Sequence, residues 1–204
     1  MTKNLKNVSS HHQKFRKTPH SIYNQIGRQI WTIVYILLFK PSPRFLHGWR
    51  RLLLRLFGAK IGSNVKLYPT IRLWAPWNLE LGEHCSLGDA VHCYNAAKIQ
   101  VAPFATISQN TTLCTASHDT TQLHLPLVTA DIKVGAHAWI CAEVFVMPGV
   151  DIGEGAVIGV RSTVFSSIPA WMIAFGTPCR VTRERYLQPQ PAEQGVSSIP
   201  RRIN

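Results

Sequence analysis

Residues 134–164 read VGAHAW, ICAEVF, VMPGVD, IGEGAV, IGVRST and V when the chain is divided into groups of six. An aliphatic residue begins each group, a small residue often follows it, and a small or β-branched residue stands fifth. This period matches neither the two-residue period of a half-buried strand nor the 3.6-residue period of an α-helix. A six-residue repeat is typical of a parallel β-helix, in which three groups make one triangular coil. We therefore predict that the first residue of each group, its starter, points into the core and stacks on the starter one coil away.

The same frame extends upstream of this stretch. Between residues 61 and 164 it contains fifteen starters, and fourteen of them are Ile, Leu or Val. They are Ile61, Leu67, Leu73, Leu81, Leu87, Cys93, Val101, Ile107, Leu113, Val134, Ile140, Val146, Ile152, Ile158 and Val164. Residues 117–131 do not keep the frame. We predict that they form a loop extruded from the β-helix, which is where repeat folds often hold their functional residues.

The rest of the chain is divided around this body. Ser21 is placed to cap a helix that runs to Phe39, and a second helix fits residues 44–57, with Gly58 at its C-terminal end. The predicted organisation is a disordered basic tail (1–20), a helical segment (21–58), the β-helix (59–168), a closing segment (169–187) and a disordered tail (188–204). The predicted fold class is thus all-β, with an N-terminal helical segment and a short C-terminal extension.

Positive charge is concentrated at the N-terminal side. The chain has a net charge of +12, and residues 1–79 hold fourteen Lys or Arg and no acidic residue. Two interpretations of the helical segment follow: it caps the open end of the β-helix, or its basic and aromatic residues contact an anionic membrane surface. Nucleic-acid binding is not favoured, because no recognised nucleic-acid module accompanies the charge.

Several patterns bear on location. No apolar stretch followed by a cleavage pattern lies near the N-terminus, so we expect no signal peptide. The longest apolar run, residues 30–39, is about half of the roughly 20 residues that a membrane-spanning helix needs. The five cysteines form no CxxC pair, which favours buried thiols in a reducing compartment over disulfides. We therefore expect a cytoplasmic protein, either free or bound peripherally to the inner face of the cytoplasmic membrane.

One residue of the extruded loop has catalytic character. His118 stands at the start of this loop and is followed by Asp119. A histidine that leaves a rigid coil next to an acid is a candidate general base near neutral pH.

Several motifs resemble one known family. They are the loop Ser117-His118-Asp119, Trp139-Ile140, Pro148-Gly149-Val150-Asp151-Ile152-Gly153, Gly176-Thr177-Pro178-Cys179-Arg180-Val181, Phe39-Lys40-Pro41-Ser42-Pro43, Leu56-Phe57-Gly58-Ala59-Lys60-Ile61-Gly62 and Pro76-Trp77-Asn78-Leu79. With these motifs the chain resembles the hexapeptide-repeat acyltransferases, and within them the colanic acid biosynthesis acetyltransferases, which are related to galactoside and maltose O-acetyltransferases. The resemblance implies a left-handed parallel β-helix, a homotrimer, acetyl-CoA as donor, a sugar hydroxyl in an exopolysaccharide precursor, free or lipid-linked, as acceptor, and no metal.

The resemblance also implies roles for single residues. On the acceptor side, His118 matches the catalytic base, Asn95 matches an asparagine that orients the acceptor, and Asp119 would hold the histidine or the sugar. On the donor side, the matching residues would bind acetyl-CoA, and they are Trp139, Ala142, Val160, Phe165, Ser166, Arg180 and Arg183. The chain departs from the family pattern at Val160-Arg161, and at Ser166-Ser167, where relatives often carry a lysine.

Two other functions stay open at this point. A γ-type carbonic anhydrase shares the trimeric β-helix and binds zinc through three histidines, for which His92, His118 and His124 are the residues to test. A non-catalytic β-helix scaffold is the second alternative, and the histidine in the extruded loop argues against it.

Overall fold

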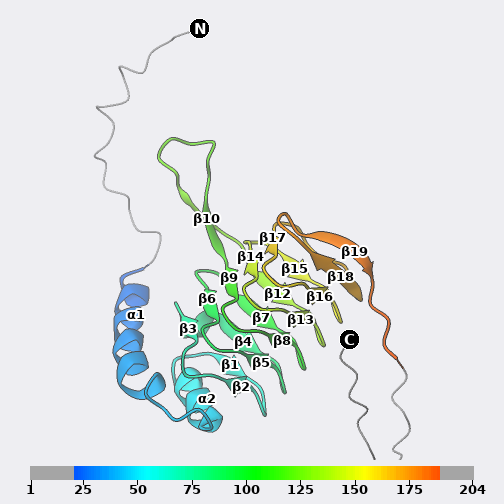
Figure 1. The fold of residues 1–204 in the computed structure, drawn as a ribbon. Helices are drawn as coiled ribbons and strands as arrows, with labels where there is room; N and C mark the ends of the chain where they lie inside the picture. Colours follow the sequence, from blue (N-terminus) through cyan, green and yellow to red (C-terminus); the bar gives the residue numbers. More distant parts are fainter. Residues whose placement is uncertain (1–20, 189–204) are drawn as a thin grey trace, which may run out of the picture.

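The computed structural model describes residues 21–188. The predicted tails, residues 1–20 and 188–204, lie outside this range except for Gln188. The body is a stack of coils with helices at its first end and a hairpin that projects from one side (Figure 1). This arrangement confirms the predicted fold class, an all-β left-handed β-helix.

Three sheets form the sides of the β-helix, and each coil contributes one strand to each sheet. The first sheet contains β1 (Lys60–Ile61), β4 (Leu79–Leu81), β7 (Ile99–Val101), β12 (Ile132–Val134) and β15 (Asp151–Ile152). The second contains β2 (Lys66–Leu67), β5 (Ser86–Leu87), β8 (Thr106–Ile107), β13 (Trp139–Ile140), β16 (Val157–Ile158), β18 (Met172–Phe175) and β19 (Arg180–Glu184). The third contains β3 (Arg72–Leu73), β6 (His92–Tyr94), β9 (Thr112–Cys114), β14 (Phe145–Val146) and β17 (Thr163–Val164).

The core is built from the predicted starters. All fifteen are buried, and they stack in register, as Ile61, Leu81 and Val101 do along the first sheet. Cys93, the one starter that is not Ile, Leu or Val, is fully buried. Burial raises the pKa of its thiol to about 12, so Cys93 packs as a small apolar residue. Small residues after the starters allow the coils to stack closely, since a Cβ added to Gly135 would lie 2.4 Å from the backbone nitrogen of Glu154.

The helical segment covers the first coil. It consists of α1 (Ile22–Val34), which continues as a π-helix, η1 (Tyr35–Phe39), and of α2 (His47–Leu56); a 3-10 turn, η2 (Pro76–Asn78), lies further on. Ser21 caps α1 as predicted, by accepting a hydrogen bond from the backbone of Asn24. In α2, Arg51 donates to the carbonyl of Val65, and Arg55 donates to the carbonyl of Ile61. These bonds satisfy carbonyl groups at the exposed edge of the first coil.

A buried arginine fixes the turn between the two helical pieces. Arg50 is fully buried and donates to the carbonyls of Leu67 and Pro43 and to the hydroxyl of Ser42, over 2.7, 2.8 and 2.7 Å. It also donates to the carbonyl of Arg44, so residues 44–46 form a turn. The second helix therefore begins at His47, three residues later than the sequence predicts.

Replacing this arginine should be costly although the charge is kept. Arg50→Lys should lower the free energy of unfolding by about 2–4 kcal/mol, because an ammonium group cannot reach the separate acceptors of the guanidinium and leaves buried carbonyls unpaired. Arg51→Lys, at a half-buried position with one such bond, is the matched control and should cost less than about 1 kcal/mol. Urea unfolding followed by circular dichroism measures both, and equal losses would contradict the role given to Arg50.

Candidate active site

The extruded segment is a β-hairpin. Its strands, β10 (Ala116–His118) and β11 (Leu127–Thr129), pair antiparallel, with His118 opposite Leu127 (Figure 1). The hairpin leaves the β-helix between β9 and β12, at the corner where the third sheet turns into the first, which we call the hairpin corner. Thr115 anchors its base, because the buried hydroxyl donates to the carbonyl of Tyr94 and accepts from the amide of Ala97.

The hairpin holds the imidazole of His118 in one orientation. Nδ1 of this exposed side chain lies 2.7 Å from the carbonyl oxygen of Leu125. Because a carbonyl oxygen can only accept, Nδ1 carries the hydrogen in this contact, and the lone pair of the neutral ring is on Nε2. This is the tautomer that a general base needs, and a backbone group selects it.

Asp119 does not hold the imidazole. Its carboxylate accepts from the backbone and hydroxyl of Thr121, over 2.9 and 2.6 Å, and from the side chain of Gln122 over 2.7 Å. The hydrogen bonds from Thr121 lower the pKa of Asp119 below its ordinary value. Its contacts therefore close the tip of the hairpin, and the orienting partner of His118 is the carbonyl of Leu125.

The carboxamide of Asn95 is bonded to the backbone. Its side chain is fully buried, its oxygen accepts from the amides of Trp74 and Ala75, and its nitrogen donates to the carbonyl of Ala75 over 2.6 Å. The carboxamide thus ties two coils together at the hairpin corner, directly before the coil that carries the hairpin. This geometry supports a positioning role for Asn95, and the acceptor-orienting role that the resemblance implies stays a prediction.

Trp139 lies on the outward side of the second sheet. Its ring is 47% exposed, and its indole nitrogen donates to the hydroxyl of Ser108 over 3.0 Å. Strand pairing places it in one cross-strand row with Val157, Ile173 and Arg183. Since neighbouring strands are about 4.8 Å apart, this row offers a straight surface from an aromatic ring to a cation about 14 Å away.

Ala142 and Val160 occupy equivalent turns of successive coils, between the second and third sheets. Within residues 21–188, neither backbone N–H takes part in a hydrogen bond, so both can donate to a ligand. Gly159, beside Val160, must lack a side chain, because an added Cβ would lie 2.6 Å from the Cβ of Phe175. We call the outward side of the second sheet, together with these two turns, the Trp139 face.

The remaining predicted residues divide between these two regions. Arg180 and Arg183 are exposed on β19, at the end of the Trp139 face. Phe165 and Ser166 are exposed after β17, at the hairpin corner and two coils beyond the hairpin. Because the hairpin corner is opposite the second sheet in the triangular cross-section, one protomer does not bring His118 and Trp139 together.

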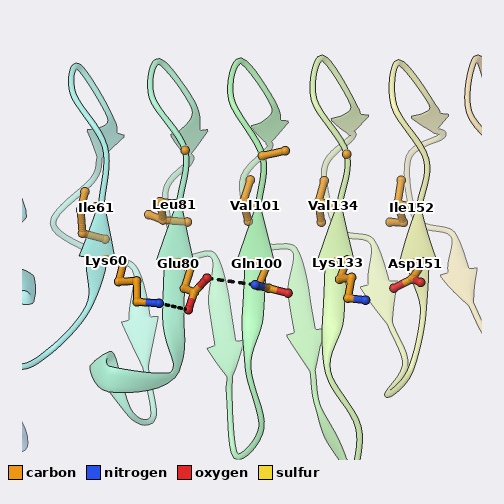
Figure 2. A pocket seen from close by; sticks show the side chains of 13 residues that line it. Lys60, Ile61, Glu80, Leu81, Gln100, Val101, Lys133, Val134, Asp151 and Ile152 are labelled. Atoms are coloured by element: carbon orange, nitrogen blue, oxygen red, sulfur yellow. Dashed lines mark hydrogen bonds and ion pairs between the residues drawn. The ribbon is translucent and has the colours of Figure 1, made fainter.

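The outward side of the first sheet is different in character. A shallow groove of about 680 Å³ lies over it, and Figure 2 shows a row of polar side chains along this groove, Lys60, Glu80, Gln100, Lys133 and Asp151. Lys60 and Gln100 each contact the carboxylate of Glu80 over 2.9 Å and lower its pKa to about 2. None of the predicted site residues lines the groove, and Lys60, Glu80 and Gln100 pair with one another as groups of a solvated surface do.

The histidines considered for zinc are on separate elements. His92 faces outward on β6, where burial lowers its pKa, whereas His118 and His124 are on the hairpin. Across the described part of the chain, no group of three or more His, Cys, Asp or Glu side chains is arranged to hold a metal ion.

Three groups that hold the hairpin or the predicted site residues in place were not identified from the sequence. They are the hydroxyl of Ser108, the hydroxyl of Thr115 and the carbonyl of Leu125. The hexad frame places Ser108 and Trp139 on successive strands of one sheet, so their contact could have been expected. The carbonyl of Leu125 has no sequence signal, because any residue supplies one.

Comparisons with known proteins agree with this fold. The "Putative colanic acid biosynthesis acetyltransferase WcaF" of Escherichia coli (strain K12) is 44% identical over 162 residues, 79% of this chain and 89% of that protein. A maltose O-acetyltransferase from Clostridium difficile 630 superposes with a TM-score of 0.74 and 24% identity, over 82% of this chain and 90% of that one. A galactoside acetyltransferase in complex with coenzyme A has the same TM-score and identity, over 82% and 84%. No family model matches the chain.

The fold is that of the left-handed β-helix acetyltransferases, and the similarity to the Escherichia coli protein places the chain among acyltransferases. More narrowly, the chain belongs to the hexapeptide-repeat acetyltransferases of the colanic acid biosynthesis family.

The burial of Asn95 leads to a test. Asn95→Ala should lower the free energy of unfolding by about 1–3 kcal/mol, because the buried amide of Ala75 loses its acceptor. Gln100→Ala is the control, since its half-buried carboxamide donates only to the carboxylate of Glu80 in the open groove, and it should cost less than about 1 kcal/mol. Thermal unfolding reports both changes. Unchanged stability of Asn95→Ala with a raised KM for the acceptor would instead restore the acceptor-orienting role.

Proposed function

We propose that the protein is an O-acetyltransferase that moves an acetyl group from acetyl-CoA to a sugar hydroxyl, in the synthesis of a colanic-acid-like exopolysaccharide. The observation that carries the proposal is the contact between Nδ1 of His118 and the carbonyl of Leu125, which leaves Nε2 as the base. Membership of the acetyltransferase family supports the type of reaction, and the relatives named for galactoside and maltose support a sugar acceptor.

The chemistry is direct transfer. Nε2 of His118 takes the proton of the acceptor hydroxyl while that oxygen attacks the thioester carbonyl. Polar groups of the site stabilise the tetrahedral oxyanion, and the C–S bond then breaks. The imidazolium returns its proton to the departing thiolate, so the products are the acetyl ester and the free thiol, and no covalent enzyme intermediate is needed.

The donor fits the Trp139 face. A pantetheine arm carries two amide groups, and the N–H groups of Ala142 and Val160, one coil apart, are donors for such an arm. The ring of Trp139 offers an apolar surface beside it, and Arg180 and Arg183 place positive charge at the far end, where phosphates would bind.

A homotrimer completes the site. The hairpin follows the last strand of the third coil. Trp139 is the first residue of β13, in the fourth coil, so the hairpin and Trp139 lie at nearly the same height along the β-helix. A threefold axis parallel to the axis of the β-helix preserves height, so the hairpin of one protomer lies at the height of its neighbour's Trp139 and can meet the Trp139 face there. The outward rows of the second and third sheets also contain Trp139, Val157 and Phe145, whereas the row on the first sheet is polar throughout.

For the location we propose the cytoplasm, with the enzyme held peripherally at the inner face of the cytoplasmic membrane. The concentration of fourteen basic and no acidic residues in residues 1–79 supports attraction to an anionic surface.

The base can be tested with a histidine from the same hairpin as control. His118→Ala should lower kcat about 10²–10⁴-fold and leave acetyl-CoA binding unchanged, because the donor face does not include His118. His124→Ala should keep wild-type activity. The measurement is transfer from radiolabelled acetyl-CoA to free and lipid-linked saccharides from cells, with coenzyme binding measured by calorimetry. Equal activity of His118→Ala and the wild type would overturn the mechanism and favour a scaffold role.

A further inference from the structure

The outer side of the first helix has no packing partner among the described residues, although it is apolar. Five residues spaced by three or four positions point away from the body and are 50–64% exposed. They are Ile22, Ile26, Ile30, Ile33 and Leu37, which we call the outer stripe. The opposite side of the same helix packs on the body through Trp31 and Phe39. A surface helix normally carries polar residues on its outer side, so the stripe indicates a second apolar environment.

The second helix extends this surface. The indole nitrogen of Trp49 donates to the carbonyl of Leu38 over 3.0 Å, which joins α2 to the end of the outer stripe. Phe45 in the turn before α2, and Leu52 and Leu56 on α2, are also exposed, and Phe45 and Leu56 are among the most exposed apolar residues of residues 21–188. Both helices lie at the first-coil end of the molecule (Figure 1), and each has exposed apolar residues there.

The charge around this surface has one sign. Lys40, Arg44, Arg55 and Lys66 are exposed on or beside the helices. Of these, Arg44 pairs with Asp89, whereas Lys40 and Lys66 form no salt bridge among the described residues. The sequence of residues 1–20 adds five more Lys or Arg and no acid. An apolar surface surrounded by cations is complementary to lipid tails beneath anionic headgroups.

We propose that the outer stripe, with Phe45, Trp49, Leu52 and Leu56, binds an anionic membrane by lying in the boundary between headgroups and acyl chains. No helix among residues 21–188 is long and apolar enough to cross a membrane. A second copy of the chain is a poorer occupant, because residues 1–79 of that copy would bring a segment with the same positive charge and no acid.

The placement of the helices relates this surface to catalysis, a step that rests on the proposed function. The guanidinium of Arg28 on α1 lies 4.1 Å from the ring centre of Trp74, and Trp74 contacts Tyr94 at 5.7 Å between ring centres. Trp74 and Tyr94 follow strands of the third sheet at the hairpin corner, so the membrane-binding helix and the hairpin lie along one corner of the β-helix. A saccharide attached to a lipid carrier would therefore be presented on the side that carries His118.

The test uses the full chain and vesicles of defined composition. The wild type should co-sediment with vesicles containing about one third phosphatidylglycerol, bind weakly to pure phosphatidylcholine, and be released at about 1 M salt, where the Debye length is near 3 Å. Ile26→Gln, Ile30→Gln and Ile33→Gln combined should lower binding at least about tenfold, because apolar burial in the lipid is lost. Gln29→Ala with Thr32→Ala, at exposed positions of the same helix, should bind as the wild type does.

Three further readouts separate the outcomes. Circular dichroism should show that the triple variant is folded, and its acetyl transfer to a free saccharide should equal that of the wild type. Wild-type protein that binds the anionic vesicles but transfers no acetyl group to a saccharide would count against the proposed function alone. Wild-type protein that stays in the supernatant with both vesicles would overturn the membrane surface. A triple variant that binds the vesicles normally would also overturn it. A triple variant whose oligomeric state, measured by light scattering without lipid, differs from that of the wild type would make the outer stripe an interface between copies of the chain.

Discussion

The structure depends on the stacking of buried starters from coil to coil. Each starter is locked in register with its counterpart, as Ile61 is with Leu81 and Val101. This stacking fixes the height and the side of every outward residue, because a strand of two or three residues cannot slip without moving its starter out of the core. The row from Trp139 to Arg183 and the opposite position of the hairpin are both consequences. The separation of the hairpin from the Trp139 face is therefore built into the β-helix, and the function we propose requires assembly to bring them together.

Much of this architecture could be predicted from the period alone, because six-residue spacing determines which residues point inward. The site could be predicted only in part. Asn95 lies in the corner that follows the starter Cys93. The six-residue frame does not predict which way a corner side chain points, and the carboxamide of Asn95 is buried. The adjacent position of Asp119 favours contact with His118, but its carboxylate accepts hydrogen bonds from Thr121 and Gln122 instead. The second helix begins late because Arg50 uses the carbonyls of the preceding turn, and no local propensity reports such a long-range contact.

The sequence predicts either a cap or a membrane contact for the N-terminal segment. In the structure the inner side of the helices forms the cap, and the outer side is where we propose the membrane contact. The inner side packs on the first coil through Trp31 and Phe39, and arginines of α2 satisfy carbonyls at the edge of that coil. The outer side remains apolar and is surrounded by cations. A segment that caps a β-helix with one side keeps the other in a fixed orientation, so membrane contact would also orient the hairpin.

The central claim is that one site needs two protomers. The most direct test is subunit complementation, with two differently tagged inactive chains, His118→Ala and Val160→Trp, that are co-expressed and purified through both tags. In a mixed cyclic trimer, one of the three sites combines an intact histidine with an intact donor face, so about one third of the wild-type activity should return. Mixed assemblies with no more activity than either parent would place the whole site within one protomer and contradict the account.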